Sequence, residues 1–309
     1  MTKVVQEIYI YKDTTEDEIQ AQIWLPTGEV KCVLQVVHGM TEHFGRYEKL
    51  ANYLTREGIA VAGFDLRGHG MNGEGMACAS FGEDGWDETL EDIHQLHCFL
   101  KKKYAATKHY LLGFSLGSFL VREYFSIYEN HDFAGTIIMG TGQQPALILS
   151  GIMAIVKGEI KKAGHDHTTD LVRNLSFGTY NKKFRPNRTK ADWLCSDETE
   201  LDKYIADGLC KEDISAGLFW QLLDSMKRTS DKNTYKKWNK NMPVLLISGE
   251  DDPVGDAGKG VRLVEKSMKN AGFTNVTMKL YSGARHDVLH EEKSGAASYA
   301  YQAIKDMIV

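Results

Sequence analysis

The sequence predicts an α/β fold with a mostly parallel central sheet flanked by helices and a helical cap inserted between two sheet strands. Short apolar runs alternate with amphipathic stretches of helical spacing, which is typical of parallel strands covered by helices on both faces. This rhythm is interrupted over residues 143–239, where no convincing strand pattern occurs. We therefore expect a core of residues 1–142 and 240–309 and a cap of residues 143–239.

The first 25 residues alternate apolar and polar side chains. Such alternation predicts a β-hairpin. A secretory signal would instead contain a continuous apolar segment. We therefore expect no export signal and a cytoplasmic location.

The remaining core elements follow from hydrophobic periodicity. Continuous apolar runs predict strands at residues 33–37, 59–64, 110–112, 135–140, 244–248 and 276–281. Apolar positions at helical spacing predict helices at residues 47–58, 86–104, 115–129 and 258–271, and one more at the C-terminus.

The cap begins with Pro145 and an apolar segment, ALILSGIMAIV, which reads as a helix with proline in its first turn. Its residues are apolar on more than one face, whereas a helix packed on one surface keeps a polar face. The additional apolar face must meet a ligand, a membrane surface or a second subunit, unless the helix is buried inside the cap itself. We expect Ile152 and Ile155 to form a wall of an acyl-binding pocket, and the cap to make transient contact with lipid surfaces.

Composition excludes several classes of function. The 309 residues carry a net charge of −5, which argues against binding of nucleic acid. No apolar run approaches the 18 residues that a membrane span requires. The five cysteines are scattered and show no CxxC spacing, so we expect reduced thiols rather than disulfides or a zinc site.

The first candidate for chemistry is Ser115 in the sequence Gly-Phe-Ser-Leu-Gly. GxSxG alone is a weak motif, but here a strand precedes it and an apolar helix follows. This context is that of a nucleophile elbow, in which a serine lies on a sharp strand-to-helix turn. A phosphate-binding loop would need Gly-Lys-Ser/Thr, which is missing, and an ordinary tight turn is the remaining alternative.

A loop that follows the strand at residues 33–37 is the second candidate. Its sequence His38-Gly39-Met40 lies where such folds supply one backbone amide for an oxyanion, and the other amide belongs to Leu116, directly after the serine. His38 precedes the elbow in the chain, whereas the base is expected last. We therefore interpret His38 as a structural, hydrogen-bonded residue.

An acid and a base are expected after the two last strands. Asp251, Asp252 and Asp256 compete for the acid, and a cation site in this acidic cluster is an alternative. His286 lies in a glycine-containing loop after the final strand, as expected for a general base. We interpret His290 as a residue that surrounds the site or lies at the surface.

The stretch HGMTEHFGRYEKLANYLTREGIAVAGFDLRGHGMNGEG resembles the corresponding region of monoglyceride lipases and related bacterial lysophospholipase-like α/β-hydrolases. GFSLGS, SGEDDPV and YSGARHDVLHE occur where that family keeps its elbow, acid and base. The resemblance covers residues 33–140 and 244–292. It implies an α/β-hydrolase fold with Ser115 as nucleophile, Asp252 as acid, His286 as base, and the amides of Met40 and Leu116 as the oxyanion hole.

The resemblance also implies a reaction. A serine carboxylester hydrolase would cleave a monoacylglycerol, a lysophospholipid or a similar small acyl ester through an acyl-enzyme, with no metal or organic cofactor. A hydrolase of other specificity, such as a peptidase or a C–C hydrolase, is the main alternative, since fold does not determine substrate. A receptor that only binds a ligand has no need for a complete set of nucleophile, acid and base, and the pattern disfavours it.

Overall fold

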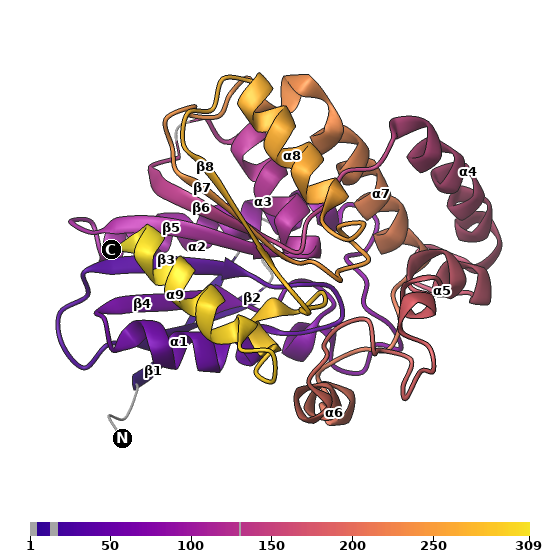
Figure 1. Cartoon of the computed structure of the whole chain (residues 1–309), viewed down its shortest axis with the longest axis horizontal. Helices are drawn as coiled ribbons and strands as arrows, with labels where there is room; N and C mark the ends of the chain where they lie inside the picture. Colours follow the sequence, from indigo (N-terminus) through magenta and orange to yellow (C-terminus); the bar gives the residue numbers. More distant parts are fainter. Residues whose placement is uncertain (1–4, 13–17, 130) are drawn as a thin grey trace.

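A mixed sheet forms the centre of the molecule. The computed structural model describes residues 5–12, 18–129 and 131–309, with side chains from residue 20 onward, and this part of the chain forms one sheet of eight strands in the order β1-β2-β4-β3-β5-β6-β7-β8 (Figure 1). The strands are β1 (Val5–Lys12), β2 (Glu18–Leu25), β3 (Cys32–Val37), β4 (Ile59–Phe64), β5 (Lys108–Phe114), β6 (Phe133–Met139), β7 (Val244–Gly249) and β8 (Val276–Tyr281). The predicted strands are therefore confirmed.

Strand direction divides the sheet into two parts. β1 pairs with β2 and β2 with β4 in antiparallel fashion, whereas β4, β3, β5, β6, β7 and β8 run parallel to one another. The pairing of β1 with β2 confirms the predicted N-terminal hairpin, whose turn lies outside the described residues. Because the parallel strands share one direction, the loops that follow them meet at the same edge of the sheet.

Helices cover both faces of the sheet, as predicted (Figure 1). They are α1 (Glu48–Thr55), α2 (Gly85–Lys103), α3 (Leu116–Ile127), α8 (Lys259–Asn270) and α9 (Ala296–Ile308). Alternate strand residues point to opposite faces, so Leu34 and Val36 of β3 pack in one core cluster with α1 and α9. Val33 and Val37 pack in the other, with α2, α3 and α8.

The residues predicted as a cap are inserted between β6 and β7 and lie beyond one end of the sheet (Figure 1). They form α4 (Ala146–Ala163), α5 (Asp170–Ser176), α6 (Glu198–Ala206) and α7 (Ala216–Ser230). α7 packs on α4 within the insertion and on α3 of the core, and so connects the two. No strand occurs in the described residues 143–239, which agrees with the sequence pattern.

The first helix of the insertion is longer than the sequence pattern indicated. Pro145 is its N-cap, and α4 continues beyond the apolar segment to Ala163. The additional sequence, KGEIKKA, is rich in good helix formers. Gly164 then ends the helix with φ of 94°, a value that glycine adopts without steric cost.

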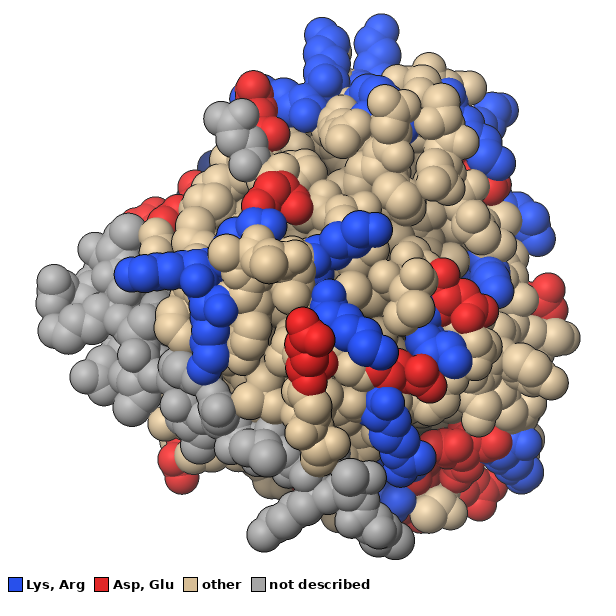
Figure 2. All heavy atoms as spheres, turned by 90° about the vertical axis from the view of Figure 1, so that its left-hand side faces the viewer, with Lys and Arg blue, Asp and Glu red and all other residues tan. Residues whose placement is uncertain are grey.

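Two surface properties bear on the predicted partners. On the face shown in Figure 2, which lies away from the insertion, side chains of both charge signs occur among uncharged residues. Every helix within the described residues is too short or too polar to cross a lipid bilayer.

Candidate active site

Ser115 lies at the junction of β5 and α3, where the parallel strands end. Its φ of 51° is positive, which is uncommon for a residue with a side chain. The turn is held in place because the Ser115 amide donates to the Met139 carbonyl at 2.9 Å, and the Ser115 carbonyl accepts from the Ser118 amide at 2.9 Å. The predicted strand–turn–helix context of the elbow is therefore present.

The two glycines of the motif are required by close backbone contacts. A Cβ on Gly117 would overlap the carbonyl oxygen of Val37 in the neighbouring strand β3. A Cβ on Gly113 would overlap the carbonyl oxygen of Gly117. The turn can be this sharp only when both positions lack a side chain.

Ser115, His286 and Asp252 form a continuous chain of hydrogen bonds. His286 Nδ1 lies 2.9 Å from Asp252 Oδ1, and its Nε2 lies 2.8 Å from Ser115 Oγ. Asp252 is fully buried and His286 almost fully. A carboxylate can only accept, so Nδ1 carries the imidazole proton and Nε2 is left to accept from the serine hydroxyl. The arrangement can remove a proton from Ser115.

Burial separates Asp252 from the other two acids. Asp252 Oδ1 also accepts from the Val254 amide at 2.8 Å, and Oδ2 accepts from Ser248 Oγ at 3.1 Å. The Asp251 side chain is 42% exposed and forms an ion pair with Lys183. The Asp256 side chain is 60% exposed. Of these three carboxylates, only Asp252 contacts His286.

His38 has the structural role predicted for it. It is fully buried, its Nε2 accepts from the Leu66 amide at 2.8 Å, and its Nδ1 donates to the Gly39 carbonyl at 2.7 Å. Burial lowers the pKa of His38 from 6.5 to about 4. A neutral imidazole with both nitrogens occupied holds the strand β3 end against the neighbouring loop.

The residues predicted to form the oxyanion hole, Met40 and Leu116, lie in the same region. Both residues line the cavity that contains Ser115 and His286. Leu116 is the first residue of α3, where an amide has no partner within the helix. Among the described residues, no hydrogen-bond acceptor is found for either amide. Two free N–H groups beside a serine hydroxyl are what an oxyanion hole requires.

Glu42 fixes the conformation of the loop that carries Met40, and the sequence pattern did not identify it. This buried carboxylate accepts from the Gly39 amide at 2.6 Å, from Tyr47 Oη at 2.9 Å and from Arg46 Nε at 2.9 Å. The bond to Gly39 closes a tight turn over residues 39–42, which holds the intervening Met40 amide in position. The sequence signal that could have identified Glu42 is its position, because it is an acid that directly follows the predicted oxyanion loop.

Ser115 opens into a cavity of about 210 Å³. Most of its lining is apolar and comes from the insertion: Ile148, Leu149, Ile152, Leu175, Phe177, Trp193, Phe219, Leu222, Leu223 and Met226. The core contributes Met40, Phe114, Leu116 and Phe119. A chamber of this composition suits an apolar group attached to the atom that Ser115 attacks.

The two α4 residues that we predicted to line an acyl pocket differ in position. Ile152 is half-buried and lines the cavity. Ile155 is 48% exposed and does not belong to the cavity lining. Consecutive turns of α4 present Leu149 and Ile152 to the cavity, while Ile155 lies one turn further along, on the exposed face.

A polar cluster adjoins the apolar part of the cavity. Arg46 donates to Asp287 Oδ2 at 2.7 Å and also binds Glu42. The Arg46 guanidinium lies over the Tyr204 ring, 4.8 Å from the ring centre. Tyr204 Oη and Thr41 Oγ1 share a hydrogen bond of 2.8 Å. Glu42, Asp287, Tyr204 and Thr41 all line the cavity. Hydroxyl groups of a substrate can be bound here.

His290 belongs to this cluster and is buried, so of the two predicted positions it occupies the one around the site and not the one at the surface. Its Nδ1 lies 2.9 Å from Asp287. Burial alone would raise the pKa of Asp287, but His290 and Arg46 together hold it below its ordinary value. Asp287 is therefore an ionised acceptor at neutral pH.

One segment of the insertion supports the loop that carries His286. The Asp287 amide donates to the Leu194 carbonyl at 2.7 Å, and the Ser196 amide donates to Glu291 at 2.9 Å. The Trp193 ring lies 5.2 Å from the His286 ring. Residues 193–196 thus pack directly against the histidine loop, a contact that sequence periodicity could not reveal.

Metal-ligating side chains come together at one place in the part of the chain that the structure describes. They are His43, Asp207 and Cys210, and none of them lines the cavity. The carboxylates near Ser115 are already bound by Arg46 or by His286. The alternative of a cation site at residues 251–256 finds no support, because those residues are not among the described groups of potential metal ligands.

Comparison with known proteins identifies relatives along most of the chain. Residues 28–293 match the family model described as serine aminopeptidase, S33. Monoglyceride lipase from Homo sapiens is 30% identical over 272 residues, which cover 87% of this chain and 79% of the human protein. The enzyme from Rattus norvegicus is 28% identical, with the same shares covered.

A solved structure supports the same fold. The carboxyl esterase from Bacillus coagulans superposes with a TM-score of 0.88 at 23% sequence identity, and the match covers 99% of this chain and 100% of the esterase. At this level of identity the likeness concerns the fold.

Proposed function

The chain belongs to the serine aminopeptidase S33 family and is a serine ester hydrolase of the α/β-hydrolase fold, and from this premise we propose that it cleaves monoacylglycerols through an acyl-enzyme formed on Ser115. The observation that carries the proposal is the hydrogen-bonded chain from Ser115 Oγ through His286 to buried Asp252. The relatives named monoglyceride lipase support the substrate class.

In the proposed mechanism, His286 Nε2 accepts the Ser115 proton as the hydroxyl oxygen attacks the ester carbonyl. Asp252 holds the imidazole in the required tautomer and stabilises the imidazolium that forms. The amides of Met40 and Leu116 stabilise the tetrahedral oxyanion, at about 3 kcal/mol for each donor in comparable sites. His286 then protonates the leaving alcohol, and a water molecule attacks the acyl-enzyme by the same route.

The proposed acyl chain lies in the apolar part of the cavity. Side chains of α4 and α7, among them Ile152 and Met226, would contact it. Burial of each methylene group contributes about 0.8 kcal/mol, so esters of medium chain length should react faster than acetates. By this proposal residues 143–239 form a cap that determines acyl specificity.

The polar cluster supports an alcohol part with free hydroxyl groups. Glu42, Asp287 and Tyr204 line the cavity together with the serine, and glycerol hydroxyls can replace water on such acceptors and donors. An aminopeptidase would need an unpaired acid to bind the terminal ammonium of its substrate. Among the described lining residues the two carboxylates, Glu42 and Asp287, are both bound by Arg46, which favours a neutral ester.

Contact with lipid surfaces is proposed through the outer face of α4. Leu147, Ile148 and Ile155 of this helix are exposed, and three exposed lysines follow them at 157, 161 and 162. Apolar side chains beside basic ones favour adsorption to anionic lipid. Such contact would bring a lipid-dissolved substrate close to the cavity.

The test compares substrate classes under one set of conditions. We expect 1-monoacylglycerols of medium chain length to be hydrolysed with a higher kcat/KM than lysophosphatidylcholine of equal chain length or aminoacyl p-nitroanilides. The Ser115→Ala variant should be inactive on all three classes. Preferential hydrolysis of the anilides would contradict the lipase proposal and identify a peptidase. Preference for lysophosphatidylcholine would exclude monoacylglycerols as the preferred class.

A further inference from the structure

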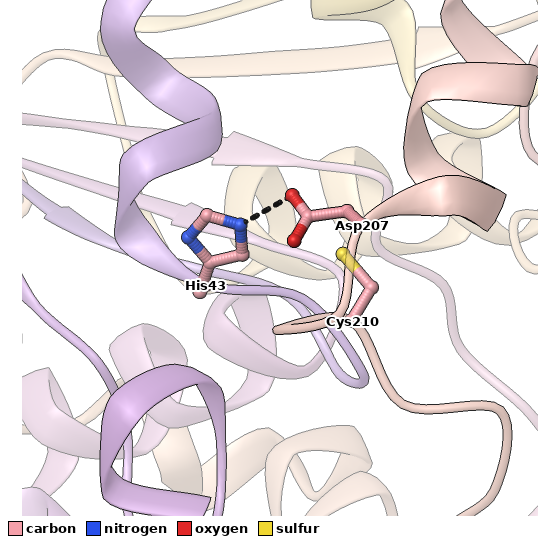
Figure 3. A group of neighbouring side chains, drawn as sticks. All are labelled: His43, Asp207 and Cys210. Atoms are coloured by element: carbon pink, nitrogen blue, oxygen red, sulfur yellow. Dashed lines mark hydrogen bonds and ion pairs between the residues drawn. The ribbon is translucent and has the colours of Figure 1, made fainter. Parts of the chain in front are cut away.

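We propose that His43, Asp207 and Cys210 bind a zinc ion that fastens the insertion to the loop after Met40. Figure 3 shows the three side chains directed toward one another from two segments that are distant in sequence. One ligand atom of each lies within 4.8 Å of the others. His43 Nε2 lies 2.8 Å from Asp207 Oδ2.

The donor set matches the coordination chemistry of zinc. Zinc binds cysteine sulfur at about 2.3 Å and histidine nitrogen or carboxylate oxygen at about 2.0 Å, in tetrahedral geometry. Tetrahedral ligands at these bond lengths are about 3.3–3.8 Å apart, so the three side chains need only small movements to surround an ion. A water molecule would complete four ligands.

The ligands are already oriented by the backbone. Asp207 Oδ1 accepts from the Leu209 amide at 2.9 Å, which turns Oδ2 toward His43. The Cys210 amide donates to the Asp207 carbonyl at 3.0 Å, so the two ligands belong to one tight turn. Such hydrogen bonds orient metal ligands in known sites.

The same two segments are joined by further contacts. The Lys211 amide donates to the Thr41 carbonyl at 3.0 Å, and Thr41 Oγ1 lies 2.8 Å from Tyr204 Oη. A metal ion at the His43 site would strengthen this junction. Because Met40 lies only three residues before His43, the ion would also restrain the proposed oxyanion loop.

Local charge permits a divalent cation. The Arg46 guanidinium is the positively charged group near the Cys210 thiol, and it is itself paired with Glu42 and Asp287. Asp207 contributes a carboxylate whose Oδ2 lies 2.8 Å from His43 Nε2. On binding, the Cys210 thiol releases its proton to solvent and the Zn–S bond forms, while His43 binds through a neutral imidazole nitrogen.

This inference departs from the sequence analysis, which predicted no metal site. Zinc motifs are detected in a sequence as pairs of ligands at short spacing. Here His43 and Asp207 are 164 positions apart, and a single cysteine contributes the sulfur. The site exists only because α6 ends beside the loop at residue 43.

Cobalt(II) tests the site without reference to catalysis. The full-length protein is first treated with EDTA, dialysed and titrated with Co²⁺. We expect a sulfur-to-cobalt charge-transfer band in the near ultraviolet that saturates at one equivalent. Cys210→Ser should lose the band, whereas Cys98→Ser, which changes an exposed cysteine on α2, should keep it. Absence of the band in the wild type, or its persistence in Cys210→Ser, would overturn the proposal.

Thermal unfolding gives a second measurement. Addition of Zn²⁺ should raise the unfolding temperature of the EDTA-treated wild type and of Cys98→Ser, because a ligand that binds only the folded state stabilises it. His43→Gln and Cys210→Ser should show little or no rise. An equal rise in all four proteins would mean binding elsewhere and would contradict the assignment.

Discussion

Asp252 differs from Asp251 and Asp256 in its surroundings and not in its chemistry. It accepts from Val254, Ser248 and His286 within the core, whereas Asp251 faces solvent beside Lys183. The motif alone did not decide which of the three carboxylates is the acid, and only the resemblance to a family selected Asp252. Burial and contact with the imidazole now support that selection.

The first prediction compares two adjacent acids. Asp252→Asn should lower kcat by about 10³- to 10⁴-fold, because an amide opposite Nδ1 favours the wrong imidazole tautomer. Asp251→Asn should change kcat by less than about threefold, because a surface ion pair contributes little. Steady-state kinetics on one p-nitrophenyl ester gives the kcat of both variants for comparison. A larger loss of kcat in Asp251→Asn than in Asp252→Asn would identify Asp251 as the acid.

The second prediction concerns His38 and acid stability. The pKa of His38 is about 4 in the folded protein and 6.5 in the unfolded chain. Between these values the unfolded chain binds a proton that the folded protein does not, so the free energy of unfolding falls as the pH drops from about 6.5 to about 4, by up to about 3 kcal/mol. Chemical denaturation at a series of pH values across this range measures the free energy of unfolding.

The matched variant for this prediction is His38→Gln. It should be less stable at neutral pH but should show a shallower decline between pH about 6.5 and about 4. Burial also lowers the pKa of His69 and His97, so part of the decline should remain. An identical pH dependence in the variant and the wild type would mean that His38 does not contribute.

At the scale of structural elements, the loop of residues 39–42 depends on one carboxylate. Glu42 binds the Gly39 amide and is itself held by Arg46 and Tyr47. Burial, followed by the neighbouring charge of Glu42, raises the pKa of Tyr47, so the phenol stays a donor. The loop conformation thus depends on the three contacts of Glu42.

The third prediction follows from this dependence. Glu42→Gln loses the charge that binds Arg46 and weakens the hold on Gly39. On a p-nitrophenyl ester, which has no glycerol hydroxyls, kcat should fall by roughly 10- to 100-fold while KM changes little, because an oxyanion donor acts mainly in the transition state. Tyr47→Phe removes a contact of Glu42 without touching Gly39 and should have a smaller effect. Because unfolding lowers apparent kcat at unchanged KM, kcat is expressed per folded enzyme, counted by titration of Ser115 with a fluorophosphonate. A rise in KM as large as the fall in kcat would contradict a role of Glu42 in the transition state alone.

The fourth prediction compares two positions one turn apart along α4. Ile152 lines the cavity and Ile155 does not. Ile152→Asn should shift the preferred acyl chain to shorter esters, since a buried amide in an apolar wall is unfavourable for a methylene chain. Ile155→Asn is the matched control and should leave the chain-length profile unchanged. Identical profiles for wild type and Ile152→Asn would place the acyl site elsewhere.

At the scale of the whole molecule, the insertion does more than cover the cavity. Residues 193–196 bind the loop of His286, and Tyr204 and Lys211 bind Thr41. The insertion therefore supports both the loop of His286, the proposed base, and the proposed oxyanion loop. A protein that lacks it would lose the support of these loops as well as the wall of the cavity.

The sequence was most informative where structure is local. Periodicity indicated the inner strands because β3, β4, β5, β6 and β7 are buried on both faces. Ser115 was found because its motif and flanking elements are contiguous. Arg46 and Asp287 are 241 positions apart, and Leu194 and Asp287, joined by a backbone hydrogen bond, are 93 positions apart. The first contact follows from the folding of the core and the second from how the insertion folds back on it, and neither spacing nor hydropathy encodes such contacts.

The central claim is that an ester's acyl group is transferred to Ser115. The most direct measurement mixes the protein with p-nitrophenyl octanoate, stops the reaction with acid within the burst phase and maps the acylated peptide by mass spectrometry. We predict an octanoyl group on Ser115 and none in Ser115→Ala. An acyl group on another residue, or rapid release of p-nitrophenol by Ser115→Ala, would contradict the account.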